Sequence, residues 1–159
     1  MISFGRSRIS VLYYEWKDVK TMIYLKRQAT VKGGRDGHIT TPNKSLDLKM
    51  AKPEEMGGSP NQQTNPEELF LAGYIGCLAS SFEFLAGKMD ATYDALEIAG
   101  EIDLQDNADK GGFEFGVRLT FKIQGLSDEQ KQTLVAQTFG FCPFSRAIKG
   151  NVDVSHTIV

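Results

Sequence analysis

The stretch NPEELFLAGYIGCLASSFEFLAGK at residues 65–88 decides the fold of this chain. It opens with three features that favour a helix start, namely a cap residue, a proline at the first helical position and a glutamate three residues after the cap: Asn65, Pro66 and Glu68. The residues that follow, 69–86, are apolar almost all round. A helix without a polar face must be enclosed on every side, by the sheet of its own domain or by another subunit.

Strands are predicted before this helix. Residues 23–31 have the pattern of one strand, and the glycine-rich stretch GGRDG at 33–37 predicts a turn that returns the chain through Ile39. Apolar and charged residues alternate over 46–50, which predicts a half-buried strand before the loop at 52–63. This part of the chain is therefore expected to form a hairpin and one further strand.

After the helix, the strongest strand signal is the unbroken alternation over 113–123. The elements expected there are, in chain order, a strand over 96–104, a turn at 106–112, the strand over 113–123, a helix started by Ser127 with Gln130, a short helix that Cys142 and Pro143 open and Gly150 ends, and a strand over 152–158. This order of elements predicts an α+β fold, not a parallel βαβ series.

Composition and charge exclude several classes of protein. The 159 residues are 41% hydrophobic and 24% charged, which is typical of one globular domain. Eighteen basic and 20 acidic residues leave a net charge of −2, so nucleic acid is not an expected partner. The longest uncharged stretch, residues 69–82, has 14 residues and falls short of the roughly 20 needed to cross a bilayer. Without a secretory signal pattern either, we expect a cytoplasmic protein with no membrane partner.

The N-terminal segment differs from the rest of the chain. Up to Arg27 it carries six basic and two acidic residues, a local charge of +4 that leaves −6 for the remainder. A second methionine, Met22, stands just before the more regular pattern. We interpret residues 1–21 as an extension, either an added edge strand or a start placed too far upstream, and residues 22–159 as a single domain.

The two cysteines are the candidate reactive groups. Cys77 lies in the middle of the apolar helix, where it is either an inert small core residue or one member of a redox pair with Cys142. Cys142 lies where a helix begins, and free N–H groups with the helix dipole favour a thiolate there. Two cysteines and two histidines are too few and too scattered for a structural zinc site, so no metal is expected.

Three stretches together resemble the organic hydroperoxide resistance family within the OsmC-like superfamily: GGRDG at 33–37, TNPEELFLAGYIGC at 64–77 and CPFSRAIKGNVDV at 142–154. The resemblance covers about residues 23–159. It implies antiparallel sheets around two central helices, an intertwined homodimer, and a thiol peroxidase that acts on organic hydroperoxides.

The resemblance also implies roles for four residues. Cys77 matches the cysteine that attacks the peroxide, Cys142 the resolving cysteine, Arg35 the active-site arginine and Glu67 the glutamate that holds this arginine. No bound metal, flavin or haem is implied, because sulfur performs the redox step. An external dithiol is expected to regenerate the thiols, in this family typically a lipoyl-type dithiol on a lipoylated protein.

Substrate preference and two rival functions stay open at this point. Leu78, Phe141 and Phe144 are candidates for an apolar pocket that prefers alkyl or fatty-acid hydroperoxides, although each also suits plain core packing. An arginine at position 146 resembles the pattern of the osmotically induced branch of the superfamily. Membership of that branch would imply another substrate preference. The alternatives are a non-catalytic thiol redox sensor and a structural dimer module with inert thiols.

Overall fold

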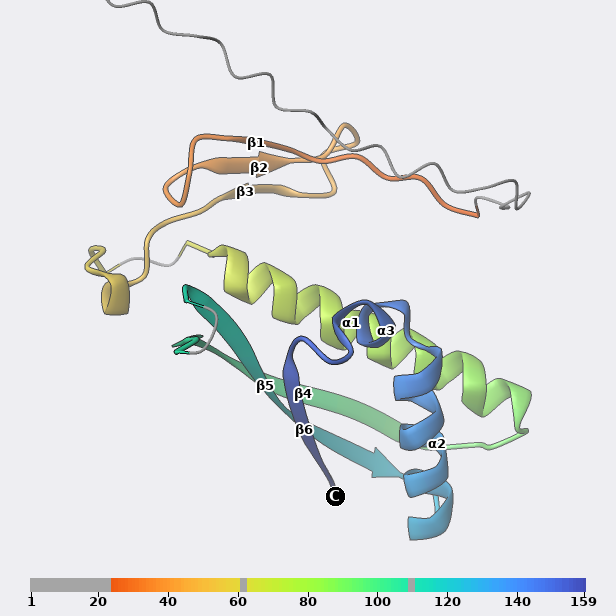
Figure 1. Cartoon of the computed structure of the whole chain (residues 1–159). Helices are drawn as coiled ribbons and strands as arrows, with labels where there is room; N and C mark the ends of the chain where they lie inside the picture. Colours follow the sequence, from red (N-terminus) through yellow and green to blue (C-terminus); the bar gives the residue numbers. More distant parts are fainter. Residues whose placement is uncertain (1–23, 61–62, 109–110) are drawn as a thin grey trace, which may run out of the picture.

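The computed structural model describes residues 24–60, 63–108 and 111–159, so the predicted extension at 1–21 lies outside the described residues. In these ranges the long helix runs between two three-stranded sheets (Figure 1). The first sheet contains β1 (Thr30–Lys32), β2 (His38–Thr40) and β3 (Asp47–Lys49), and the second contains β4 (Ala95–Asp106), β5 (Phe113–Gln124) and β6 (Asp153–Ile158). The helices are η1 (Glu54–Met56), α1 (Pro66–Lys88), α2 (Asp128–Phe141) and α3 (Pro143–Ile148). The α+β class is confirmed.

The second sheet is mixed, whereas antiparallel sheets were expected. The first sheet is antiparallel throughout, as is the long pairing of β4 with β5. In contrast, β6 lies parallel to β5, with Gly116 opposite Asp153 and Phe121 opposite Ile158. Parallel neighbours need a crossover connection, and α2 with α3 supplies it between these two strands.

The start of α1 confirms the predicted cap. The Asn65 side chain accepts a hydrogen bond from the Glu68 backbone N–H at 2.8 Å, and Pro66 is the first helical residue. The Glu68 carboxylate does not return to the cap residue but accepts a hydrogen bond from the Thr64 hydroxyl at 3.0 Å. Both contacts satisfy or orient groups at the helix N-terminus, which fixes the position of the first turn.

The core lies between α1, α2 and the inner face of the second sheet. Its fully or almost fully buried apolar residues are Tyr74, Leu78, Phe82 and Ala86 of α1, Val117, Leu119, Phe121 and Ile123 of β5, and Leu134 and Val135 of α2. The α1 residues are spaced by four, so they form one face of the helix. That spacing explains why α1 packs on the sheet along most of its length.

The opposite face of α1 is open in the single chain, so the enclosure expected on every side is not complete within it. Ala72, Gly73, Gly76 and Phe84 are exposed there. Among the described residues, α1 is the helix whose length and composition would allow it to cross a membrane, with a mean hydropathy of 1.6. Core helices of globular domains share this character, and the inner face of α1 contacts β4, α2 and α3.

The first sheet is smaller than predicted. The strand expected over 23–31 is reduced to Thr30–Lys32, because the pairing with β2 begins at Thr30 opposite Thr40. Tyr24 and Leu25 before it are 89% and 66% exposed and have no regular structure. The hairpin itself is confirmed, and three apolar residues of the first sheet and its edge remain 53%, 40% and 37% exposed: Val31 in β1, Leu46 just before β3 and Leu48 in β3.

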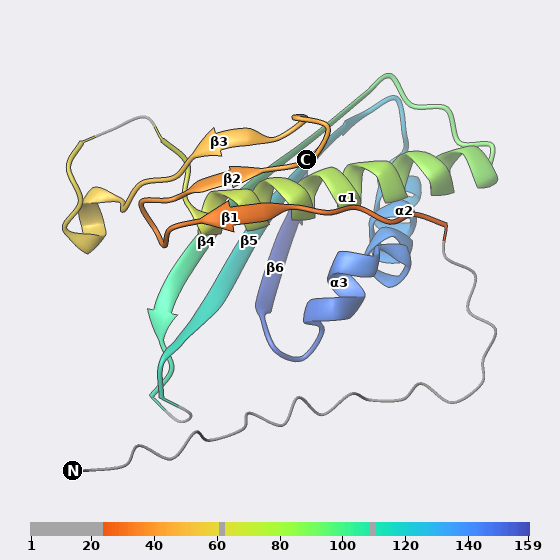
Figure 2. The ribbon, with the colours of Figure 1, turned by 90° about the horizontal axis from the view of Figure 1, so that it is seen from above.

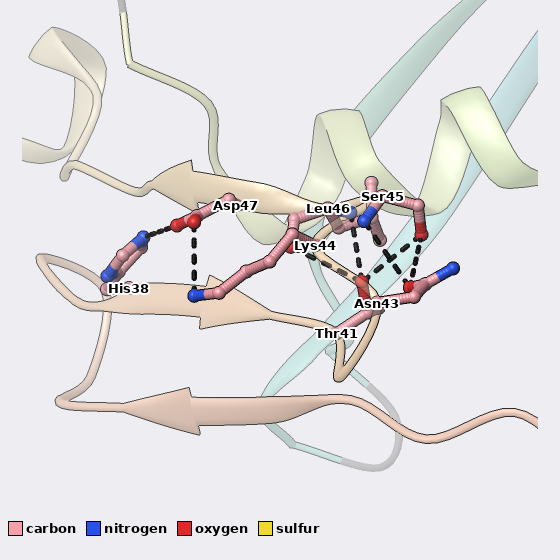
Figure 3. A network of polar contacts seen from close by, with 7 residues as sticks. All are labelled: His38, Thr41, Asn43, Lys44, Ser45, Leu46 and Asp47. Atoms are coloured by element: carbon pink, nitrogen blue, oxygen red, sulfur yellow. Dashed lines mark hydrogen bonds and ion pairs between the residues drawn. The ribbon is translucent and has the colours of Figure 1, made fainter.

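Polar contacts hold the connection between β2 and β3 (Figure 3). Lys44 adopts a left-handed backbone with φ of 60°. Asp47 contacts both Lys44 Nζ at 3.2 Å and His38 Nε2 at 2.6 Å, and the hydrogen bond from Lys44 followed by that from His38 lowers the pKa of this carboxyl group. The hydroxyls of Thr41 and Ser45 share a hydrogen bond beside them. The turn is thereby stabilised without an apolar core of its own.

One glycine sets how closely α1 approaches the second sheet. A Cβ atom at Gly100 of β4 would lie 2.9 Å from a Leu71 methyl, 3.1 Å from a Leu119 methyl and 3.3 Å from an Ile75 methyl. These distances are below ordinary contact, so a side chain here requires Leu71, Leu119 and Ile75 to move. A Cβ at Gly116 on the neighbouring β5 would meet nothing closer than 3.8 Å.

We therefore expect Gly100→Val to destabilise the fold by about 1–3 kcal/mol, the usual cost of overpacking a core. Gly116→Val is the matched control and should be neutral or slightly stabilising, because valine favours strands. Urea unfolding of both variants measures the difference. Equal midpoints would show that α1 does not depend on the missing side chain.

Candidate active site

The two cysteines meet although 65 residues separate them in sequence. Cys77 lies halfway along α1, and Cys142 is the residue at which α2 ends and α3 begins. Their sulfur atoms are 2.9 Å apart and both thiols are free. A disulfide bond is about 2.05 Å long, so a small movement joins the two atoms. Cys142 is fully buried and Cys77 is partly exposed, which leaves Cys77 as the accessible member of the pair.

The surroundings of the two sulfurs differ in electrostatic effect. Burial, followed by the hydrogen bond with Cys142, raises the pKa of Cys77 above its ordinary value. Burial also acts to raise the pKa of Cys142, but hydrogen bonds from Cys77 and from the N–H and hydroxyl of Ser145 together lower it. In the single chain, these effects favour the negative charge on Cys142 over Cys77.

Arg35 and Glu67 form the second part of the candidate site. The Arg35 guanidinium donates two hydrogen bonds to the Glu67 carboxylate, at 3.0 and 2.6 Å. The hydrogen bond from Arg35 lowers the pKa of Glu67 and outweighs the opposing effect of burial, so the pair stays ionised at neutral pH. The bidentate geometry fixes the arginine side chain.

The turn that presents Arg35 requires its glycines. Gly33 has a φ of 86°, which other residues rarely adopt. A Cβ at Gly37 would lie 2.5 Å from the Lys32 carbonyl oxygen, so this position has no room for a side chain. The GGRDG stretch thus places the guanidinium at the tip of the β1–β2 hairpin, over the first turn of α1.

The structure does not bring the two pairs of residues together within one chain. Glu67 and Cys77 lie on one continuous helix, ten residues apart, which corresponds to about 15 Å along the axis. The first sheet lies over the N-terminal half of α1, whereas α3 lies beside the middle of α1 and α2 beside its C-terminal half (Figure 2). The chain therefore contains a thiol pair and an arginine–glutamate pair that lie apart from each other.

The three candidate pocket residues have different surroundings. Leu78 is fully buried in the core. Phe141 and Phe144 are 47% and 42% exposed, and the Phe141 ring stacks on Phe84 at 5.0 Å. Phe144 follows Cys142 by two residues, and its backbone N–H acts to lower the pKa of Cys77. The exposed apolar surface at the cysteines is therefore made by the phenylalanines, whereas Leu78 packs α1 against the core.

The sequence reasoning missed three residues around the sulfurs. The Ser81 hydroxyl lowers the pKa of Cys77, and the Ser145 hydroxyl lowers the pKa of Cys142. The buried Tyr74 in turn contacts Ser145, with 3.0 Å between the two oxygens. Helix spacing was the available signal, because positions three or four residues from a cysteine share its face: Tyr74 and Ser81 for Cys77, and Ser145 for Cys142.

Comparisons with known proteins identify the family. A family model described as OsmC-like protein matches residues 58–157. The organic hydroperoxide resistance protein of Xanthomonas axonopodis pv. citri is 36% identical over 134 residues, which are 82% of this chain and 91% of the relative. The organic hydroperoxide resistance protein OhrB of Bacillus subtilis is 38% identical over 133 residues, 84% and 96% of the two chains.

A solved structure agrees with these relatives. The crystal structure of an organic hydroperoxide resistance protein OsmC from Legionella pneumophila has a TM-score of 0.81 and 36% identity, and covers 86% of this chain and 98% of that one. The names carried by relatives at this identity favour the organic-peroxide branch over the osmotically induced branch that Arg146 suggested. This chain belongs to the organic hydroperoxide resistance family of OsmC-like proteins.

Proposed function

We propose that this protein is a thiol peroxidase that reduces organic hydroperoxides to alcohols. The observation that carries the proposal is the 2.9 Å approach of two free thiols, Cys77 and Cys142, in a member of this family. Inert core cysteines have no reason to lie in contact with helix N–H groups and hydroxyls directed at them. The names of the relatives, which refer to resistance to organic hydroperoxides, give the substrate class.

The chemistry requires two steps. In the first, the Cys77 thiolate attacks one peroxide oxygen, so that a sulfur–oxygen bond forms, the oxygen–oxygen bond breaks, and the departing alkoxide takes a proton to become the alcohol. In the second, the Cys142 thiolate attacks the sulfenic sulfur of Cys77, and hydroxide leaves and is protonated to water. The resulting disulfide protects Cys77 from irreversible oxidation. An external dithiol, which we expect to be of lipoyl type on a lipoylated protein, then returns both residues to thiols.

The first step needs a positive charge at Cys77, which its own Arg35 does not supply. Arg35 is held by Glu67 about 15 Å along the helix, and the pKa of Cys77 within its own chain is raised by burial and by Cys142. A guanidinium beside the sulfur would instead favour the thiolate and stabilise the departing oxygen. A second copy of the chain can bring this guanidinium to the site.

The geometry of α1 supports such a homodimer. If two α1 helices cross antiparallel at a two-fold axis near residue 72, residue 67 of one lies opposite residue 77 of the other, because 72 is midway between them. Ala72, Gly73 and Gly76 at this point are exposed and small, and a Cβ at Gly76 would meet nothing within 4 Å of its own chain. The crossing would also cover the open face of α1, and the partner could cover the exposed apolar residues of the first sheet.

The substrate is expected to carry an apolar group. Phe141, Phe144 and Phe84 give the accessible side of the thiol pair an apolar surface. Alkyl or fatty-acid hydroperoxides can bury their hydrocarbon part there, whereas hydrogen peroxide gains nothing from it. A cytoplasmic location is the matching prediction, because reducing conditions keep both cysteines available as thiols.

The two cysteines should fail at different steps. Cys77→Ser should consume no cumene hydroperoxide, while Cys142→Ser should consume one equivalent and then stall with oxidised Cys77. Stopped-flow peroxide consumption, followed by assays with dihydrolipoamide, measures both stages. Wild-type protein that turns over only once with the dithiol would indicate a redox sensor, and equal loss of the first turnover in both variants would contradict the assigned roles.

Subunit sharing can be tested by complementation. Heterodimers of a Cys77→Ser chain with an Arg35→Ala chain contain one site with an intact cysteine and an intact partner arginine, so we expect about half of the wild-type activity. Each parent homodimer should be nearly inactive, and circular dichroism should show that both are folded. Purified heterodimers that remain as inactive as the parents would place the whole site within one chain.

A further inference from the structure

A buried hydrogen bond connects α1 to α3 directly behind the thiol pair. The phenol oxygen of Tyr74 lies 3.0 Å from the hydroxyl oxygen of Ser145, across 71 residues of sequence. Tyr74 is 1% exposed and Ser145 is 9% exposed. A tyrosine buried this deeply could pack equally well as phenylalanine, so the polar contact indicates a use for the hydroxyl group.

Ser145 connects this contact to the resolving cysteine. Cys142 is the N-cap residue of α3, so Ser145 lies three positions into the helix, on the side of the sulfur. Both its backbone N–H and its hydroxyl act on Cys142 to lower the pKa of this thiol. The serine hydroxyl thus contacts the phenol and also acts on the cysteine sulfur.

The direction of the hydrogen bonds follows from the number of protons. Each hydroxyl carries one proton, and among the described residues Ser145 is the partner found for the Tyr74 phenol. If Ser145 donated to Tyr74, the phenol proton would point into the buried interior. Donation from Tyr74 to Ser145 leaves the serine proton free for sulfur. Burial raises the pKa of Tyr74, which keeps the phenol protonated as a donor.

We propose that Tyr74 and Ser145 are positioning residues for the resolving step, in which Tyr74 donates to Ser145 and Ser145 donates to the Cys142 thiolate. This inference rests on the proposed peroxidase function and assigns a residue pair to its second step. The relay holds the negative charge on Cys142 while this sulfur attacks the Cys77 sulfenic acid, the sulfur–sulfur bond forms, and hydroxide leaves to be protonated to water.

The relay acts on one sulfur of the pair. Cys77 receives its own hydroxyl contact from Ser81, on the next turn of α1, and not from Ser145. Loss of the relay should therefore slow disulfide formation and leave the attack on peroxide near its wild-type rate. A purely structural role for Tyr74 would instead disturb both steps, since α1 and α3 carry both cysteines.

The test is a single turnover of the reduced full-length protein with one equivalent of cumene hydroperoxide. Peroxide loss reports the first step, and trapping with dimedone followed by mass spectrometry reports how long the sulfenic acid survives. For Tyr74→Phe and Ser145→Ala we expect peroxide loss close to wild type and disulfide formation slowed about tenfold, the usual effect of a hydrogen bond to a charged group. The pH profile of the second step should move to higher pH, because the Cys142 thiolate is less stabilised.

Two further variants complete the experiment. Ser145→Thr keeps the hydroxyl and should restore most of the rate of disulfide formation. Tyr93→Phe is the matched control, because Tyr93 packs against Phe82 beyond the C-terminal end of α1. Disulfide formation in Tyr74→Phe with the wild-type rate and pH profile would overturn the relay. Wild-type protein that forms no disulfide with peroxide would instead refute the proposed function itself.

Discussion

The continuity of α1 is the constraint on which the rest of the structure depends. Ten residues of unbroken helix separate Glu67 from Cys77, and a helix cannot be shortened to bring them together. The inner face of α1 is fixed by the core, from Tyr74 to Ala86, and by its close approach to Gly100 on β4. The first sheet, which carries Arg35, is tied to the start of this helix by the ion pair with Glu67. Within a single chain, the arginine–glutamate pair and the thiol pair are therefore held apart along α1.

This separation explains two features that otherwise look like defects of the single chain. The outer face of α1 is open and lined with small residues near position 72, and the first sheet leaves Val31, Leu46 and Leu48 exposed. Both are surfaces that a second copy could bury. The raised pKa of Cys77 also follows from this separation. Burial and the neighbouring thiol of Cys142 raise this pKa, while Arg35 of the same chain is bound to Glu67 and not to Cys77. Cys142, in contrast, obtains its stabilisation from within the chain, through the start of α3 and Ser145.

Much of the fold could be predicted from the sequence, because local signals and core pattern agree. Asn65 and Pro66 mark the start of α1, and the capping box at Ser127 with Gln130 marks the start of α2. The prediction of a strand over 23–31 was wrong for most of its length, because the pairing of a strand depends on a partner strand that the local sequence pattern does not reveal. The parallel pairing of β6 depends on the path of α2 and α3 across the sheet. A short stretch of sequence therefore determines neither the length of β1 nor the direction of β6.

Only part of the candidate site could likewise be predicted from the sequence. Arg35, Glu67, Cys77 and Cys142 were found by resemblance, and the structure brings them together as two pairs. Tyr74 and Ser145 were not found, because a tyrosine in an apolar helix and a serine near a helix start both have ordinary structural explanations. Their relation depends on α1 and α3 meeting in space, which no spacing within either helix expresses.

The most direct test is the pKa of Cys77 in the Cys142→Ser protein, measured from the ultraviolet absorbance of the thiolate against pH. The account predicts a value below the ordinary thiol value of about 8.5, with a return to a higher value when Arg35→Gln is added. Burial raises this pKa, and Arg35 of the same chain is held by Glu67, so a value that is lowered only while Arg35 is present indicates a charge from the partner subunit. A pKa that stays above the ordinary value whether or not Arg35 is present would contradict the shared site.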